Sequence, residues 1–131
     1  MKNKTPYSIL FFVLALMTFY ATSTESAEAD YVEKYCEGVI EHVLSDRTRV
    51  DCLTAEYAIE YDFARKWAEA IGQSLHYARM TGKKPGIALI MTKEGDSRYL
   101  ERVNGVIDEY QLPITFWTIM VSYEGIRFVN I

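Results

Sequence analysis

The sequence predicts an α/β domain, with a mixed central sheet flanked by helices in the order α-β-β-β-α-β-α-β. Three segments within residues 39–63 alternate polar and apolar side chains with the period of two that is typical of strands. Two longer segments, 64–80 and 96–110, repeat apolar side chains at helical spacing. Between them, residues 87–92 form the continuous apolar run of a central strand that is covered on both faces.

The first 29 residues have the layout of a secretory signal peptide. Lys2 and Lys4 give a positive start, an apolar run follows, and Ala27-Glu28-Ala29 supplies a small-x-small cleavage pattern. The apolar run is about 14 residues long, shorter than the ~20 that a spanning helix needs. We therefore expect an exported protein, periplasmic or secreted, that keeps no stable membrane anchor after cleavage. A retained membrane anchor is the alternative interpretation.

Residues 30–131 are expected to form a single domain, because about 100 residues suit one hydrophobic core. Half of the chain, 50%, is hydrophobic, which is enough to fill that core. The net charge of −4 gives no overall attraction to nucleic acid, so binding of DNA or RNA would need a local basic patch. Arg79, Lys83 and Lys84 are the tight cationic cluster, and such a cluster is more often a solvated helix end.

The first half of this domain is expected to contain one helix and three strands. Residues 30–37 have a short helical pattern that begins at Asp30, a favourable N-cap residue, and stops before Gly38. Residues 39–45 and 49–54 are typical of two strands around a tight turn, and residues 58–63 of a third.

The second half is expected to alternate helices and strands. The apolar stripe of helix 64–80 consists of Trp67, Ile71, Leu75 and Ala78. Thr81-Gly82 ends that helix. The inward face of helix 96–110 consists of Tyr99, Leu100, Val103, Ile107 and Tyr110. Pro113 prevents its continuation, and residues 114–131 are typical of a last strand or of a hairpin about residues 124–125.

Two cysteines, Cys36 and Cys52, lie in the expected mature chain. In an oxidising compartment an even pair of cysteines indicates a disulfide. The alternative is that both are small apolar side chains in the core.

Acidic residues interrupt each of the three predicted strands: Glu41 on the first, Asp51 on the second, and Glu60 with Asp62 on the third. A turn centred on Asp46 places Glu41 across from Asp51. A buried carboxylate costs several kcal/mol unless it is paired or binds a cation, so converging acids favour a divalent cation site. The alternative is a solvated strand face on which each acid pairs with a local Arg or Lys.

A second line of side chains follows the helix at 64–80, beside its apolar stripe. Lys66, Ala70, Gln73 and Tyr77 recur at helical spacing. A solvated face more often carries Glu and Lys than Gln and Tyr, so this line is interpreted as a polar seam facing a site. The alternative is that these are ordinary residues flanking the apolar stripe.

Asp51, Glu60-Tyr61-Asp62, and Gln73 followed by Tyr77 together resemble the PD-(D/E)XK nuclease superfamily. The likeness is to its RecB-type branch, with an Asp on one strand, D/E-x-K on the next and Q-x-x-x-Y on the following helix. It covers about residues 39–92 and implies a restriction-endonuclease-like core with the order α-β-β-β-α-β.

This resemblance implies metal-dependent hydrolysis of phosphodiester bonds in DNA or RNA. Asp51 and Glu60 would ligate Mg²⁺ or Mn²⁺, and Glu41 would join them as the upstream acid does in many members. Gln73 and Tyr77 would orient the site or contact the nucleic-acid backbone. The metal would activate water and stabilise charge on the phosphate.

The sequence departs from the family pattern where the lysine of D/E-x-K is expected, because Asp62 stands there. Asp62 is then expected to orient the site, and Lys66, on the polar seam, to substitute as the catalytic lysine beside Asp51 and Glu60. The departure leaves a second interpretation open: a catalytically inactive nuclease-fold module, accessory or immunity-like, that binds a protein partner in the periplasm. A third is a generic α/β domain whose motif match arose by chance.

Overall fold

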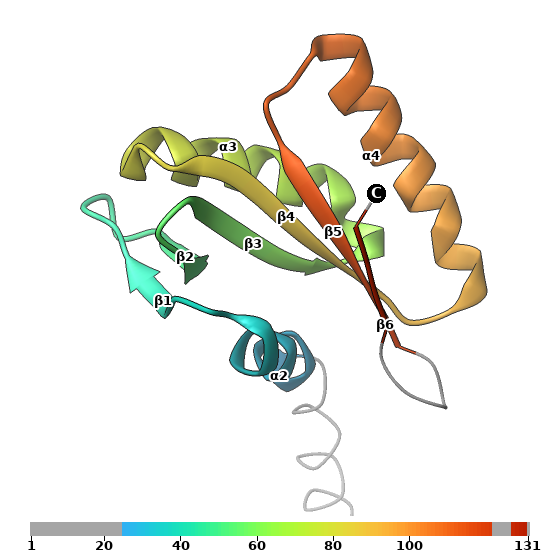
Figure 1. Cartoon of the computed structure of the whole chain (residues 1–131), viewed down its shortest axis with the longest axis horizontal. Helices are drawn as coiled ribbons and strands as arrows, with labels where there is room; N and C mark the ends of the chain where they lie inside the picture. Colours follow the sequence, from blue (N-terminus) through green and yellow to red (C-terminus); the bar gives the residue numbers. More distant parts are fainter. Residues whose placement is uncertain (1–24, 122–126, 131) are drawn as a thin grey trace, which may run out of the picture.

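The structure is a computed structural model that describes residues 25–121 and 127–130. Its elements follow the predicted order α-β-β-β-α-β-α-β, and one further strand returns along the sheet (Figure 1). Residues 1–24 of the predicted signal peptide and the predicted turn at 124–125 lie outside the described residues. Within the described ranges, no helix combines the length and the apolar character needed to cross a membrane.

Six strands form one sheet in which chain order is also spatial order (Figure 1). They are β1 (Val39–Val43), β2 (Arg49–Leu53), β3 (Tyr57–Phe63), β4 (Lys84–Met91), β5 (Thr115–Met120) and β6 (Arg127–Asn130). β1, β2 and β3 are antiparallel, β3, β4 and β5 are parallel, and β6 returns antiparallel to β5. Parallel neighbours need crossover connections, and α3 (Trp67–Thr81) and α4 (Ser97–Tyr110) supply them.

Helices cover both faces of the sheet, as predicted, and β4 shows this most clearly. Its Ala88 and Ile90 pack in a core cluster with Val32 of α2 (Glu25–Tyr35). The alternating residues Ile87 and Leu89 pack in a second cluster with α3 and α4. β4 is therefore the doubly covered central strand that its continuous apolar run indicated.

The helix predicted at 64–80 is a 3-10 turn, η1 (Ala64–Lys66), followed by α3. It ends at Gly82, whose φ of 68° is the left-handed conformation that glycine adopts readily. The predicted apolar stripe packs in the core, but only in part. The most deeply buried residues of α3 are Ala70, Ser74 and Tyr77. Because α3 packs across both β3 and β4, its buried face also includes the seam that carries Tyr77.

The N-terminal helix differs from its prediction. It begins at Glu25, five residues before the predicted Asp30, and it ends at Tyr35. Residues 25–29 favour a helical conformation, but they fall within the predicted leader, so the prediction begins the helix after them. Directly after this helix, Cys36 forms the predicted disulfide with Cys52 of β2, which fastens α2 to the sheet.

One residue predicted to face inward on α4 does not. Tyr110 is 72% exposed, whereas Val103 is fully buried. Tyr110 is the last residue of the helix, and Gln111 follows it in the left-handed conformation. The chain thus leaves the helix before Pro113, and Tyr110 lies beyond the edge of the sheet that α4 covers.

Candidate functional site

The site begins where β2 and β3 separate. The register pairs Cys52 with Ile59 and Leu53 with Ala58. At the next step the Asp51 side chain enters the ladder: its Oδ2 accepts a hydrogen bond from the backbone N–H of Tyr61 at 2.8 Å. The carboxylate thus satisfies a strand donor that would otherwise need a backbone partner. This contact holds Asp51 beside Glu60 of β3.

Glu60 is a buried acid with one unpaired oxygen. Glu60 is 6% exposed, and its Oε2 has no hydrogen-bond partner among the described residues. Burial, followed by the charges of Asp51 and Asp62, raises the pKa of Glu60 to about 9. Burial also raises the pKa of Asp51, to about 6. Asp51 and Glu60 therefore titrate as a pair that keeps a proton to a pH well above the ordinary range of carboxyl groups.

Asp62 lies at the end of β3, on the same face as Glu60, and is 3% exposed. Its Oδ1 is 3.2 Å from Nζ of Lys66, an ion pair by distance, although Oδ1 makes no aligned hydrogen bond among the described residues. Burial raises the pKa of Asp62 to about 7 despite the opposing effect of Lys66. The predicted catalytic lysine is therefore beside the acidic cluster.

A fourth acid lies next to this cluster, on the helix that packs against the opposite face of the sheet. Glu28 of α2 accepts a hydrogen bond from Lys66 Nζ, 3.1 Å from its Oε1. Its charge also contributes to the raised pKa values of Asp51, Glu60 and Asp62. Glu28 falls within the predicted leader, and nothing in its spacing marks it as a site residue.

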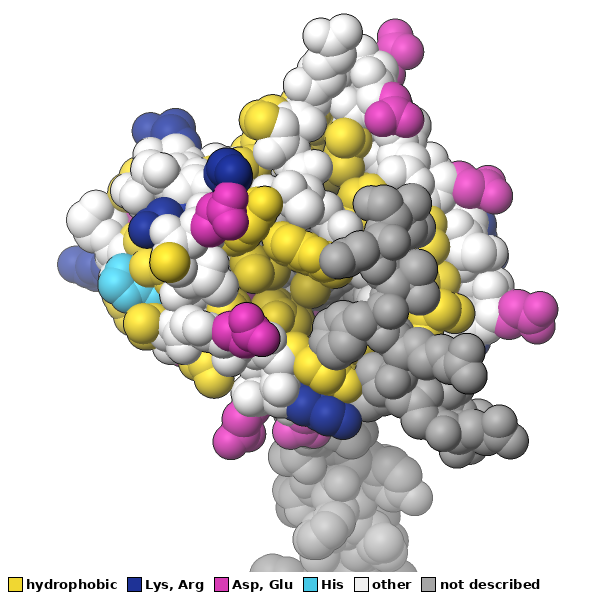
Figure 2. Space-filling model, in the orientation of Figure 1, with side chains coloured by type: hydrophobic (Ala, Val, Ile, Leu, Met, Phe, Trp, Pro, Cys, Tyr) yellow, Lys and Arg dark blue, Asp and Glu magenta, His cyan; other side chains and the backbone are white. Residues whose placement is uncertain are grey.

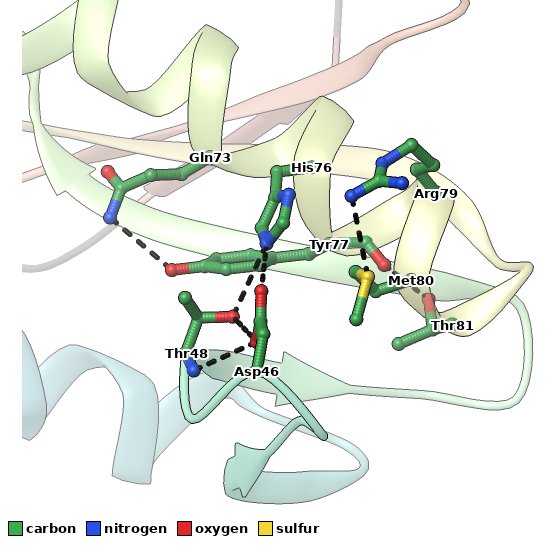
Figure 3. Close-up of polar contacts among 8 residues, drawn as sticks. All are labelled: Asp46, Thr48, Gln73, His76, Tyr77, Arg79, Met80 and Thr81. Carbon is green, nitrogen blue, oxygen red and sulfur yellow. Dashed lines mark hydrogen bonds and ion pairs between the residues drawn. The ribbon is translucent and has the colours of Figure 1, made fainter.

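Gln73 and Tyr77, the Q-x-x-x-Y pair of α3, point toward each other in Figure 3, and Gln73 Nε2 donates to the Tyr77 hydroxyl at 3.4 Å. Tyr77 is buried. Burial, and then the charge of Glu60, raises its pKa, with a smaller contribution from Asp51. Tyr77 is thus within electrostatic reach of these carboxyl groups, while it packs with Leu44, Val50 and Ala58.

Glu41 lies across from Asp51 in the strand register, between the pairs Ile40–Cys52 and His42–Val50. Its carboxylate, however, is exposed and forms an ion pair with Arg49 at 2.7 Å. A φ of 55° at Glu41 breaks the regular strand there. Among the described residues, no three His, Cys, Asp or Glu side chains are arranged to hold a metal ion together.

Two carboxylates still suit a hard divalent cation. Mg²⁺ is commonly bound by one or two carboxylates, with waters and substrate phosphate completing its octahedron. Asp51 and the unpaired oxygen of buried Glu60 supply such a pair. Glu41, tied to Arg49, does not belong to it in this arrangement.

A polar network beside the seam was not predicted. In Figure 3, His76 of α3 reaches Asp46 in the β1–β2 turn, with Nε2 2.7 Å from Oδ2. Thr48 donates to Asp46 Oδ1 through its hydroxyl, at 2.6 Å, and its backbone N–H, at 3.0 Å. The sequence Asp-x-Thr predicts the turn. It does not identify His76 as a partner of Asp46, because the two residues are 30 positions apart in the chain.

The basic cluster at the end of α3 is engaged in local contacts. Lys83 Nζ donates to the carbonyl of Ala55 at 2.6 Å, and Lys84 pairs with Glu56. Arg79 is exposed. These contacts agree with a solvated helix end more than with a patch for nucleic acid.

Comparisons with protein-family models, with curated proteins and with solved structures find no match to this chain. The likeness to the PD-(D/E)XK superfamily therefore rests on the motif residues.

Proposed function

We propose that this chain is an exported, metal-dependent nuclease that hydrolyses phosphodiester bonds of DNA or RNA at the cluster formed by Asp51, Glu60 and Lys66. The observation that carries the proposal is the unpaired carboxyl oxygen of Glu60, buried beside a second carboxylate. Such a group is costly for an apolar core to keep. A bound cation would give that oxygen a partner and would favour its ionised state.

Each residue has a distinct part in this proposal. Asp51, fixed by the N–H of Tyr61, and Glu60 would hold Mg²⁺ or Mn²⁺. Such an ion supplies Lewis acidity and lowers the pKa of water. Lys66, anchored on Asp62, would neutralise charge on the phosphate. Gln73 and Tyr77 would fix the position of the cluster through their own hydrogen bond.

Thermal unfolding tests the cation site directly. Wild type should gain several degrees in melting temperature when EDTA is replaced by saturating Mn²⁺, because a ligand that binds only the native state stabilises it. Asp51→Asn should melt higher than wild type in EDTA, since it removes a partly buried negative charge that lies near Glu41 and Glu28, and should lose the Mn²⁺ shift. Glu41→Gln is the matched control: it removes a neighbouring exposed acid and should keep the shift.

Hydrolysis is then measured on single- and double-stranded DNA and on RNA, with Mn²⁺ and with EDTA. Cleavage that requires Mn²⁺ and is lost in Asp51→Asn supports the proposal. A Mn²⁺ shift retained in Asp51→Asn, or absent from wild type, contradicts the assigned site.

A specific observation favours a second candidate, an inactive nuclease-fold binding module. Glu41, the upstream acid, is paired with Arg49, and the described residues offer no group of three metal ligands. Under this alternative, wild type shows neither a Mn²⁺ shift nor cleavage, while Glu60→Gln is simply more stable. The next experiment would then be a search for a protein partner.

A further inference from the structure

Glu28 lies both in the predicted leader and in a helix of the folded domain. In sequence it stands within Ala27-Glu28-Ala29, the predicted cleavage pattern. In the structure it lies in α2, and its carboxylate accepts a hydrogen bond from Lys66 at 3.1 Å. Cleavage after Ala29 would therefore remove a side chain that is built into the candidate site.

Glu28 binds Lys66 in the way that an anionic ligand would. Carboxylate and phosphate oxygens bind the same ammonium donors through charge-assisted hydrogen bonds. Lys66 already has one fixed partner, Asp62, at 3.2 Å. Glu28 takes a second position on the same ammonium, and its own charge repels any other anion there. The side chains of Lys66 and Glu28 are 40% and 25% exposed, so the pair lies at the solvent-accessible side of the cluster.

We propose that Glu28 is an intramolecular block: in the unprocessed chain it occupies the phosphate position at Lys66, and cleavage after Ala29 opens that position. The inference rests on the proposed function and specifies how the same site is regulated. A nuclease made in the compartment that holds the cell's own nucleic acid would meet its substrate before export. A blocking residue carried by the leader keeps the site closed until the leader is removed.

The position of the cleavage pattern also fixes an order of events. Residues 27–29 lie inside a helix that packs on the sheet and is fastened next to the Cys36–Cys52 disulfide. Cleavage is therefore expected in the translocating, unfolded chain, before α2 packs. A chain that folds before export keeps Glu28 and stays blocked.

The test uses the full chain made by cell-free synthesis under oxidising conditions, so that the leader is retained. Binding of inorganic phosphate is measured by calorimetry for wild type and for Glu28→Gln. Glu28→Gln should bind phosphate about tenfold more tightly, because one repulsive charge is lost at the binding position. Glu33→Gln is the matched control: an exposed acid of the same helix, it makes the same change in charge and should bind as wild type does.

Two further samples complete the experiment. Adding Lys66→Met to Glu28→Gln should abolish the gain in phosphate affinity, and protein recovered after export should begin at Asp30 by mass spectrometry and bind phosphate as Glu28→Gln does. Equal affinity in wild type and Glu28→Gln, a gain that survives Lys66→Met, or an exported chain that retains Glu28 would each overturn the inference. If the proposed function alone is wrong, the result is different: the affinity for phosphate rises in Glu28→Gln, but no variant shows a Mn²⁺ shift or cleavage.

Discussion

Lys66 turns back toward Asp62, four residues earlier in the chain, and its Nζ lies 3.2 Å from Oδ1. Asp62 stands where the D/E-x-K motif has its lysine. The ion pair therefore holds a cation beside the strand position at which that motif has its lysine. Under the proposed function, Lys66 and Asp62 would together take the place of that lysine.

Under the proposed function, Lys66→Met is the most informative substitution for catalysis. It keeps the length of the side chain but leaves buried Asp62 without a cation. Cleavage activity in Mn²⁺ should fall about a hundredfold, the scale on which a single charge-stabilising group acts in a transition state, while the Mn²⁺ shift in melting temperature remains. Steady-state rates with wild type and variant measure the loss.

Lys84→Met is the control for this substitution. Lys84 forms an exposed pair with Glu56, and solvent and salt screen such pairs, so they contribute little to stability. Its cleavage rate should equal that of wild type. Equal losses in the two variants would show that overall charge, and not the position of Lys66, sets the rate.

The buried acid Glu60 gives a prediction about pH in the absence of metal. Its pKa is about 9 in the folded chain and 4.5 in the reference state. A raised pKa contributes stability that is fully present below 4.5 and is lost as the pH rises through about 9. In EDTA, the free energy of unfolding of wild type should therefore fall between pH 5 and pH 9, as followed by urea titration.

Glu60→Gln isolates this effect. The amide has nearly the shape of the protonated acid but cannot ionise. The variant should match wild type near pH 4 and exceed it at pH 8 by several kcal/mol, because about 1.4 kcal/mol is lost for each pH unit between the two pKa values. A gap of the same size at both pH values would mean that ionisation of Glu60 is not the cause.

The disulfide gives a prediction about α2. Cys36 and Cys52 are 16 residues apart, and closing a loop of this size removes unfolded-state entropy worth about 3 kcal/mol. Reduction should lower the melting temperature accordingly.

A Cys36→Ser, Cys52→Ser double variant is the control for this prediction. It should behave as reduced wild type does, with and without reductant. A reductant effect that persists in the double variant would come from something other than this bond.

Much of the fold followed from periodicity. The alternation in residues 39–63 placed three strands within a few residues of their ends, and the order of all elements was correct. Alternation also put Glu60 and Asp62 on one face. These features are local, and each strand or helix carries its own pattern.

Features that depend on distant contacts did not follow from the sequence. Glu28 reaches the site only because α2 packs on the sheet. The ion pair between Glu41 and Arg49 depends on a local break in β1. Tyr110 fitted the helical repeat yet lies beyond the surface that α4 covers. Periodicity reports which face of a helix is apolar, but not where the partner surface ends.

A cleft was also unforeseen. On the α2 face of the sheet, a hollow of about 750 Å³ is lined by residues that include Tyr35, Tyr57, Tyr61 and Trp117. Figure 2 shows hydrophobic side chains gathered in the middle of this view. Tyr61 belongs to both sites, because it lines the cleft and its backbone N–H donates to Asp51.

Asp46 gives a last prediction, remote from the carboxylate cluster. Hydrogen bonds from Thr48, with His76 adding to them, lower its pKa from 3.8 to about 2. A lowered pKa contributes stability that is present above 3.8 and is lost as the pH falls through about 2. Asp46→Asn should therefore lower the melting temperature at pH 6, and the difference from wild type should vanish near pH 2. Asp108→Asn, at an exposed acid on α4, should leave the melting temperature unchanged at both values. A difference for Asp46→Asn that persists at pH 2 would mean that the shape of the turn, and not the charge of Asp46, holds the β1–β2 hairpin to α3.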